Sequence, residues 1–306
     1  MSLMICIPDR DCSKLLAQLQ VALPDVKIQL WPQCDDFATV EVVLAWKAPD
    51  ALWAQLPNLK LVQSFGAGVD SINLALLPES VAVARIVDPQ LGLDMSEYVL
   101  TQVLLHKLRV PQYIAQQQQK IWKPNRSYDH NRVGILGFGE LGQAVSARLL
   151  ANGFRVSAWS RSAKAAQQVK LYLGPTGLME MAAQSDYLVC LLPLTDETKG
   201  ILNTHLFSVM QEHAVIINVA RGAHLNEADL LNALDNGQLR GASLDVFNVE
   251  PLPPEHPFWY HNKIIMTPHA AALTSLNTAI EQIVDNVRRV KDGQNYLNII
   301  DKNKGY

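Results

Sequence analysis

Three short fragments combine side chains that can transfer a proton and bind an anion. They are residues 218–222, 245–252 and 267–270, and each follows an apolar run of strand length. Singly, Arg221 can be a surface charge, Glu250 a loop acid and His269 a structural histidine. Together they combine a cation that can bind an anion, an imidazole that can act as an acid or base, and a carboxylate. A carboxylate beside an imidazole also favours its protonated form.

A glycine-rich turn lies between a predicted strand at 132–136 and a predicted helix at 141–152. Its residues follow the pattern G-x-G-x-x-G: Gly137, Phe138, Gly139, Glu140, Leu141 and Gly142. In such a turn, the first glycine permits a tight bend, the second lets the backbone approach a pyrophosphate, and the third allows close packing of helix on strand. Free amides at the helix N-terminus add donors and a partial positive charge. We therefore predict a dinucleotide-binding loop.

The next predicted strand, 154–159, ends where a dinucleotide fold selects between its two nicotinamide cofactors. NAD-specific proteins usually place an acid here, on the ribose 2′-hydroxyl. This chain instead has Ser160, Arg161 and Ser162. A guanidinium and hydroxyls suit a 2′-phosphate. We predict NADP(H) as the preferred cofactor, with NAD(H) possible.

Short apolar strands and amphipathic helices alternate along the chain and position these fragments. The predicted strands are 3–7, 27–31, 40–45, 59–65, 81–85, 132–136, 154–159, 187–192, 214–219, 242–246 and 263–266. This alternation indicates an α/β protein built on parallel sheets that are covered on both faces. A long helix is predicted over 94–120, broken at Pro111 and opened by Asp94 and Glu97 as a capping box. The last helix, 273–293, is expected to return to the first domain.

Composition excludes several classes of protein. The chain has 306 residues, with 49% hydrophobic and 18% charged residues, which suits two domains with sizeable cores. A net charge of −3 gives no preference for nucleic acid or anionic membranes. No apolar run approaches the roughly 18 residues of a membrane span, and the first residues resemble a strand rather than a secretory signal. Four cysteines without metal or disulfide spacing indicate free thiols in the cytoplasm, and no metal site is expected.

In this order behind a dinucleotide loop, the three fragments resemble the D-isomer-specific 2-hydroxyacid dehydrogenase family, and the resemblance extends over residues 59–273. The resemblance implies that Arg221 holds the substrate carboxylate and polarises the 2-keto oxygen. It makes His269 the general acid in reduction, oriented by Glu250. Hydride addition to a 2-oxo acid places negative charge on the carbonyl oxygen, so a cation and a proton donor must converge there.

The resemblance also implies contacts outside the catalytic three. Within the family, the chain is most similar to a branch that reduces glyoxylate and hydroxypyruvate. Substrate contacts are implied for Trp46, Ala67, Gly68 and Val69, although Trp46 can equally be a packing residue. Cofactor contacts are implied for Leu192, Pro193, Thr198, Val219, Ala220, Asp245 and Ala271, with Asp245 at the nicotinamide amide. The chain lacks the arginine that some reductases of this branch carry just past Thr274.

The expected architecture is two doubly wound parallel-sheet domains with a cleft between them. We assign residues 1–96 and 274–306 to a flavodoxin-like substrate domain, and residues 97–273 to a Rossmann cofactor domain. The resemblance implies a homodimer formed through the cofactor domain, with helix 97–120 contributing. Small 2-oxo and 2-hydroxy acids are the expected partners.

Two alternatives remain open from the sequence. One is another D-2-hydroxyacid dehydrogenase, acting on lactate or phosphoglycerate, although residues 160–162 disfavour strict use of NAD. The other is a sensor that binds the dinucleotide without turnover. A formate dehydrogenase fits less well, because formate oxidation does not need the proton transfer for which Glu250 and His269 are suited.

Overall fold

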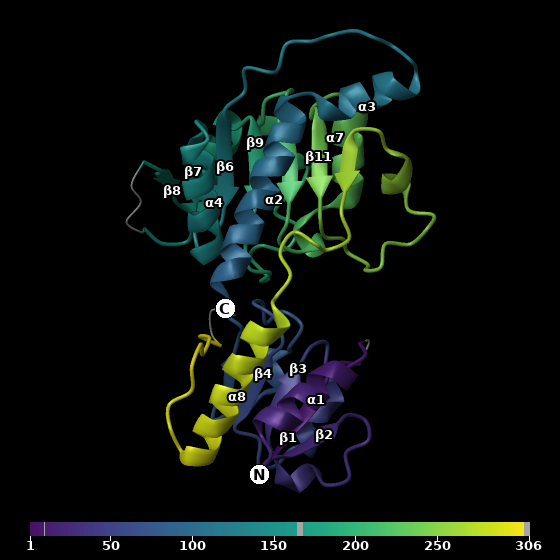
Figure 1. Cartoon of the computed structure of the whole chain (residues 1–306). Coiled ribbons are helices and arrows are strands. Elements are labelled where there is room, and N and C mark those ends of the chain that lie inside the picture. The colour runs from purple at the N-terminus through teal and green to yellow at the C-terminus, as the bar shows by residue number, and fades with distance from the viewer. Residues whose placement is uncertain (9, 164–167, 303–306) are drawn as a thin grey trace. The chain divides into compact units, whose positions relative to one another are not determined.

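The computed structural model describes residues 1–8, 10–163 and 168–302, and the chain forms two compact units. Unit 1 consists of Met1–Gln90 and Thr274–Tyr306, and unit 2 consists of Leu91–Leu273. Figure 1 shows one sheet with its own covering helices in each unit. The division lies six residues before the position expected from the sequence (90 against 96), and Thr274 begins the returning segment.

Unit 1 contains a five-stranded parallel sheet in the order β2-β1-β3-β4-β5. The strands are β1 Ser2–Cys6, β2 Lys27–Leu30, β3 Val40–Ala45, β4 Leu61–Ser64 and β5 Ala82–Ala84. This is the flavodoxin-like order. Strands β1 and β4 are buried along their whole length, as expected for a parallel sheet covered on both faces.

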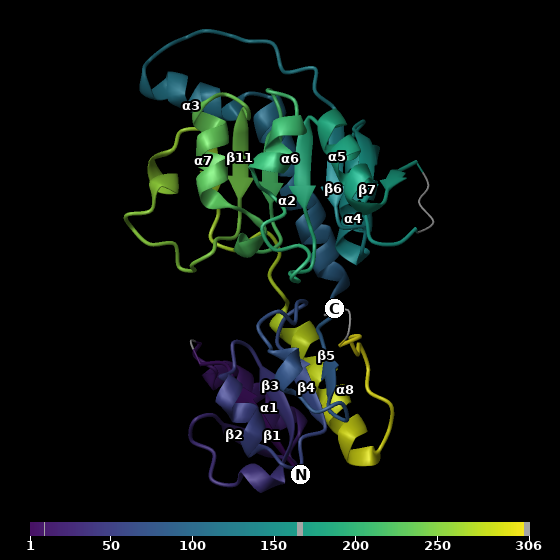
Figure 2. The ribbon, with the colours of Figure 1, turned by 180° about the vertical axis from the view of Figure 1, so that it is seen from behind.

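The last helix of the chain covers one face of the unit 1 sheet. Helices α1 (Ser13–Ala22) and α8 (Leu276–Asp292) pack side by side on this face (Figures 1 and 2). Ile283 and Val287 of α8 share a core with Leu3 of β1. The opposite face is covered by short 3₁₀ helices at Phe37–Thr39, Asp50–Gln55 and Leu74–Leu76.

Unit 2 contains a seven-stranded parallel sheet in the order β12-β11-β10-β9-β6-β7-β8. Its strands are β6 Arg132–Leu136, β7 Arg155–Trp159, β8 Lys170–Tyr172, β9 Tyr187–Cys190, β10 Val215–Asn218, β11 Gly241–Leu244 and β12 Ile264–Met266. The order reverses between β6 and β9, which is the switch point at which such sheets bind dinucleotides. The sequence analysis missed β8, because a strand of three residues at a sheet edge has no periodicity to detect.

Helices cover both faces of the unit 2 sheet. They are α2 Pro89–Lys107, α3 Val110–Gln118, α4 Glu140–Ala151, α5 Gly174–Gln184, α6 Thr204–Val209 and α7 Glu227–Asp235. Helices α2 and α4 contribute to one core and α5, α6 and α7 to the other (Figures 1 and 2). Short 3₁₀ helices occupy Gly222–His224 and Pro257–Tyr260. The doubly wound two-domain α/β fold predicted from the sequence is confirmed.

The predicted helix over 94–120 is wrong in its start, and its predicted break at Pro111 lies two residues after the observed one. Helix α2 begins at Pro89, and Asp88 caps its first turn by accepting a hydrogen bond from the Gln90 amide at 2.9 Å, so Asp94 lies inside the helix. The break comes at Arg109, whose φ of 62° is left-handed, and α3 then starts with Pro111 in its first turn. Proline is tolerated there because first-turn amides have no helical acceptor.

Candidate active site

The glycine-rich turn has the backbone geometry of a dinucleotide loop. Gly137 adopts a φ of +100°, and its amide donates to the Trp159 carbonyl at 2.9 Å. A Cβ on Gly142 would lie 2.1 Å from the Gly137 carbonyl oxygen, so only glycine allows α4 to pack this closely. A Cβ on Gly139 would meet nothing within 4 Å, which leaves open space beside the first turn of α4. Phe138 is buried in the core, so only its backbone faces this space.

The loop after β7 carries a guanidinium held by an acid from another loop. Arg161 pairs with Glu197 at 3.2 Å, and their side chains are 48% and 78% exposed. The Ser160 hydroxyl donates to the Ser162 carbonyl at 2.7 Å, so it can accept a hydrogen bond but has no proton left for a phosphate. Of the three residues predicted for a 2′-phosphate, Arg161 and Ser162 therefore retain donors for it.

The loop after β9 is fastened by a buried threonine. Thr198 donates from its hydroxyl to the Pro193 carbonyl at 2.7 Å and accepts from the Thr195 amide at 2.9 Å. The Leu192 side chain is buried in the core. A second fastening is the fully buried His224, whose Nε2 lies 3.2 Å from the Pro193 carbonyl oxygen.

The same histidine helps to hold the backbone of Arg221. His224 Nδ1 lies 3.1 Å from the Arg221 carbonyl oxygen, and Asn218 Nδ2 donates to that oxygen at 2.9 Å. Val219 and Ala220 are buried, and the Ala220 carbonyl accepts from Arg221 Nη1 at 2.7 Å. Arg221 thus comes directly after β10, and its carbonyl oxygen is in contact with both Asn218 and His224.

A histidine–glutamate pair lies at the end of the neighbouring strands. His269 Nδ1 is 2.8 Å from Glu250 Oε2, and Glu250 Oε1 accepts from the Phe247 amide at 3.0 Å. Both carboxylate oxygens are engaged, so the ring orientation is fixed and Nε2 is the nitrogen directed away from the acid. The His269 side chain is 40% exposed, which allows a reacting molecule to reach it. This is the geometry of an oriented general acid.

Asp245 organises the loop that carries His269. Its Oδ1 accepts from the Ala270 amide at 2.8 Å, and its Oδ2 accepts from the Ala271 amide at 3.0 Å. Its backbone carbonyl accepts from the His269 amide at 2.8 Å. His269 has a φ of 53°, a left-handed conformation that costs energy for a residue other than glycine and persists only when its surroundings enforce it.

In unit 1, the residues predicted to touch substrate lie together. The Trp46 ring covers Gly66 so closely that a Cβ there would lie 2.7 Å from it. Ser64 shapes the loop that follows, by accepting from the Gly66 amide at 3.2 Å and donating to the Gly68 carbonyl at 2.7 Å. Ala67 and Gly68 are partly exposed on this loop, whereas Val69 is buried and can contribute only backbone.

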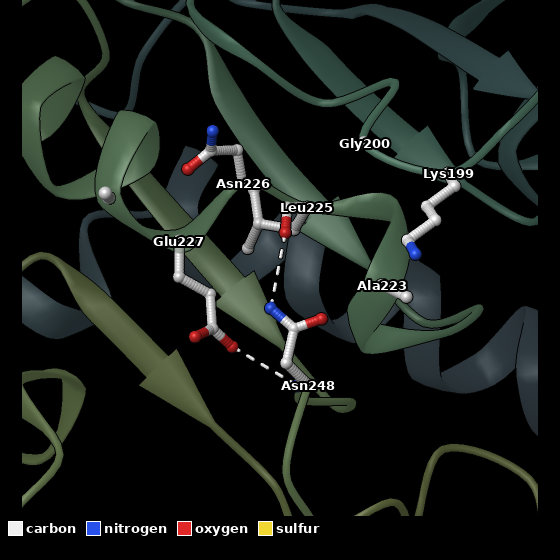
Figure 3. Close-up of a pocket in the computed structure, with 8 residues that line it drawn as sticks. Lys199, Gly200, Ala223, Leu225, Asn226, Glu227 and Asn248 are labelled. Atoms are coloured by element: carbon white, nitrogen blue, oxygen red, sulfur yellow. Dashed lines mark hydrogen bonds between the residues drawn. The ribbon is translucent and has the colours of Figure 1, made fainter.

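Unit 2 also has a surface cavity of about 440 Å³ (Figure 3). Its lining consists of Lys199, Gly200, Ala223, Leu225, Asn226, Glu227, Ala228 and Asn248. None of these was predicted as a site residue.

Within the described residues, no group of three or more His, Cys, Asp or Glu side chains could hold a metal ion, and no helix is long and apolar enough to cross a membrane.

Comparison with known proteins identifies the family. Residues 100–271 match the family model of the D-isomer specific 2-hydroxyacid dehydrogenase NAD binding domain. The chain belongs to the D-isomer specific 2-hydroxyacid dehydrogenase family. Members of this family are NAD(P)-dependent oxidoreductases, so the family and the enzyme class predicted from the sequence are confirmed.

Relatives and solved structures of this dehydrogenase family match over the whole length. The glyoxylate/hydroxypyruvate reductase A of Yersinia enterocolitica is 39% identical, with all of both chains covered. The NADPH-dependent glyoxylate/hydroxypyruvate reductase of Sinorhizobium meliloti, solved with NADP and sulfate, is 36% identical with a TM-score of 0.91 and full coverage of both chains. A family member from Xanthobacter autotrophicus, solved with NADPH and MES, is 37% identical with a TM-score of 0.91, covering 100% of this chain and 99% of that one.

Several residues that form hydrogen bonds to or within the loops of the candidate site were not predicted from the sequence. They are Ser64, Tyr98, Glu197, His224 and Thr267. Thr267 lies two residues before His269 and could have been noticed. Ser64 forms its hydrogen bonds within the next four residues. The other three act through contacts between segments that are distant in sequence, so no local pattern marks them.

Proposed function

We propose that the protein is an NADPH-preferring reductase of small 2-oxo acids, with glyoxylate and hydroxypyruvate as substrates and D-2-hydroxy acids as products. The observation that carries this proposal is the His269–Glu250 pair at 2.8 Å, together with Arg221 at the end of a neighbouring strand. The names of the full-length relatives support the choice of substrates.

The chemistry follows from the residue types. NADPH, when bound, supplies the hydride that adds to C2 of the substrate. The carbonyl π electrons move to oxygen, which takes a proton from His269 Nε2. Arg221 binds the substrate carboxylate and stabilises the developing oxyanion. Glu250 holds the imidazole in place through its Nδ1, so that Nε2 is the nitrogen available for the transfer.

The residues present fit a dinucleotide. The open space beside Gly139 and the amides that begin α4 suit the pyrophosphate. Arg161, with Ser162, is the candidate ligand of the 2′-phosphate. Nicotinamide contacts are assigned to Val219, Ala220, Asp245 and Ala271, and Trp46 with the backbone of 67–69 is assigned to the substrate.

Oligomeric state and location form part of the same proposal. Leu108, Ile114, Ile121 and Trp122 are exposed apolar side chains on α3 and its flanks, and Trp122 is 99% exposed. A homodimer in which these residues are covered explains such a surface. Sedimentation equilibrium tests this, because a monomer at micromolar concentration contradicts it.

The cysteines, all within the described residues, are unpaired, which supports a cytoplasmic location.

The deciding experiment is steady-state oxidation of NADPH and NADH with glyoxylate, hydroxypyruvate, pyruvate and 3-phosphohydroxypyruvate. Faster NADPH-dependent reduction of the first two is expected. Preference for pyruvate or 3-phosphohydroxypyruvate would favour a lactate- or phosphoglycerate-type dehydrogenase. Tight dinucleotide binding without turnover would favour a sensor.

His269→Ala tests the proposed role of His269 as the general acid. It is expected to lower kcat by about 10²–10⁴-fold, which is the usual contribution of a positioned acid. Circular dichroism and NADPH binding should remain as in the wild type. Wild-type turnover by the folded variant would remove His269 from the mechanism.

A further inference from the structure

A tyrosine on helix α2 lies at the end of a hydrogen-bonded chain that reaches the His269 loop. Tyr98 Oη is 2.5 Å from Thr267 Oγ1, and Thr267 Oγ1 donates to Asp245 Oδ1 at 2.5 Å. All three residues belong to unit 2. Neither Tyr98 nor Thr267 is among the residues proposed to contact the substrate or the cofactor.

The direction of each hydrogen bond follows from the donors available. A carboxylate only accepts, so the single hydroxyl proton of Thr267 is committed to Asp245. The Thr267 oxygen can then only accept from Tyr98, which makes the phenol the donor. Burial raises the pKa of Tyr98 to about 12, so the phenol keeps its proton throughout the working range.

The two ends of this series of hydrogen bonds lie on different elements of unit 2. Tyr98 is on a helix whose neighbouring side chains Met95 and Val99 are packed in the unit 2 core. At the other end, Asp245 holds the Ala270 and Ala271 amides, and the intervening loop includes His269 in its left-handed conformation. Helix α2 is packed in the core and can therefore restrain the loop that includes the strained residue His269.

We propose that Tyr98 is a positioning residue: its hydroxyl anchors Thr267, Thr267 orients the Asp245 carboxylate, and Asp245 holds His269 where it can protonate the substrate. This inference rests on the proposed reductase function, since it concerns the placement of that reaction's acid. Tyr98 itself touches neither the imidazole nor, in this scheme, the substrate.

Tyr98→Phe tests the proposal, because it retains the packed ring and removes only the donor. We expect kcat for 2-oxo acid reduction to fall about five- to tenfold, the equivalent of one net hydrogen bond. KM for the 2-oxo acid should stay within about twofold, because Arg221, the proposed ligand of the substrate carboxylate, takes no part in these hydrogen bonds. Tyr113→Phe is the matched control, since it removes a phenol hydroxyl that donates to the Asn125 carbonyl at 2.8 Å in a different part of unit 2. It should keep the wild-type kcat.

Two further measurements separate positioning from general stability. Thr267→Val cuts the same chain at its next link, so the double variant with Tyr98→Phe should be no slower than Thr267→Val alone. In the protein without cofactor, amide hydrogen exchange at Ala270 and Ala271 should be faster in Tyr98→Phe than in the wild type, and unchanged in Tyr113→Phe.

Several outcomes would overturn the proposal. They are a wild-type kcat in Tyr98→Phe, losses that multiply in the double variant, or unchanged exchange at Ala270 and Ala271. Each of these leaves an active wild-type reductase, so each contradicts the role of Tyr98 alone. A wild-type protein that reduces no 2-oxo acid would instead overturn the proposed function, and this inference with it.

Discussion

The His269–Glu250 pair shows how single residues orient the acid of the proposed reaction. Glu250 is fixed through both oxygens, one to the Phe247 amide and one to His269 Nδ1. Its negative charge therefore stays at one position beside the ring. A hydrogen bond to a charged acceptor is stronger than a neutral one, so the carboxylate fixes the ring orientation through Nδ1.

Glu250→Gln should lower kcat for 2-oxo acid reduction by about fivefold. The amide keeps a hydrogen-bonding group next to the ring but removes the charge that strengthens the bond to His269 Nδ1, so the ring is held less firmly. The measurement is kcat with saturating NADPH, and a wild-type kcat in the folded variant would contradict the role of Glu250 in orienting His269.

The ion pair between Arg161 and Glu197 is expected to affect the affinity for the cofactor. In the free protein, this exposed pair satisfies the guanidinium that we assign to the 2′-phosphate. Glu197 therefore competes with the cofactor for Arg161. Exposed pairs are weak, so the competition is worth about fivefold in affinity at most.

Glu197→Gln is accordingly expected to tighten NADPH binding by up to about fivefold at low salt and to leave NADH binding unchanged. Fluorescence titration at two salt concentrations measures both. Asp196→Asn is the matched control, because it removes the same charge from the neighbouring position. Equal tightening in both variants would indicate a general effect of charge rather than the pair.

At the scale of elements, the strand–turn–helix unit β6–α4 depends on two glycines in different ways. Gly142 allows contact between α4 and the Gly137 carbonyl, whereas the space beside Gly139 is open. The first glycine is needed for the fold of the unit, and the second for what binds there.

Gly142→Ala and Gly139→Ala should therefore separate folding from binding. The Gly142 variant forces a backbone shift and should lose about 1–3 kcal/mol of unfolding free energy, as in overpacked cores. The Gly139 variant should unfold near the wild-type midpoint but bind NADPH more weakly, because its methyl group occupies the space assigned to the pyrophosphate. Thermal unfolding without cofactor and NADPH titration measure the two effects. Equal midpoints for both variants would contradict the packing argument.

At the scale of the whole molecule, contacts between distant segments maintain each unit. In unit 1, the buried Asn286 of α8 donates to Gln63 of β4 at 2.8 Å and accepts from the Leu297 amide at 2.8 Å. In unit 2, Asp186 joins the starts of three strands, because it accepts from the backbone and side chain of Arg132 and from His213 Nε2 at 2.9 Å. Burial alone would raise the pKa of Asp186, but these hydrogen bonds outweigh burial and lower it to about 2.

The pH dependence of stability follows from this carboxyl. Its pKa in the folded protein lies below the ordinary value of 3.8, so its contribution is present above about pH 4 and is lost as the pH falls toward 2. Asp186→Asn should cost about 2 kcal/mol at pH 7, and the difference from wild type should shrink in acid. Urea unfolding from pH 7 to pH 3 measures this. Asp235→Asn, at an exposed aspartate beside His261, is the control and should change little. A constant difference across this range would contradict the linkage.

The sequence by itself predicted all the strands except β8, the dinucleotide loop, and the three residues that we propose as catalytic. The periodicity of apolar residues and the glycine spacing are local, and Arg221, Glu250 and His269 each follow a predicted strand. Parallel strands end at one edge of a sheet, so these residues had to gather there. Local signals were weakest at β8 and at the start of α2, where a short edge strand and a cap at Asp88 carry little pattern.

Only the tertiary structure decided which groups contact the segments that carry Arg221, Glu250 and His269. Tyr98 lies 169 positions from Thr267 and meets it at 2.5 Å, and His224 lies 31 positions from Pro193 and meets it at 3.2 Å. Hydrogen bonds of this kind depend on how helices and loops pack over the sheet. A sequence records the residue types but not that packing, because many long-range contacts form together when the chain folds.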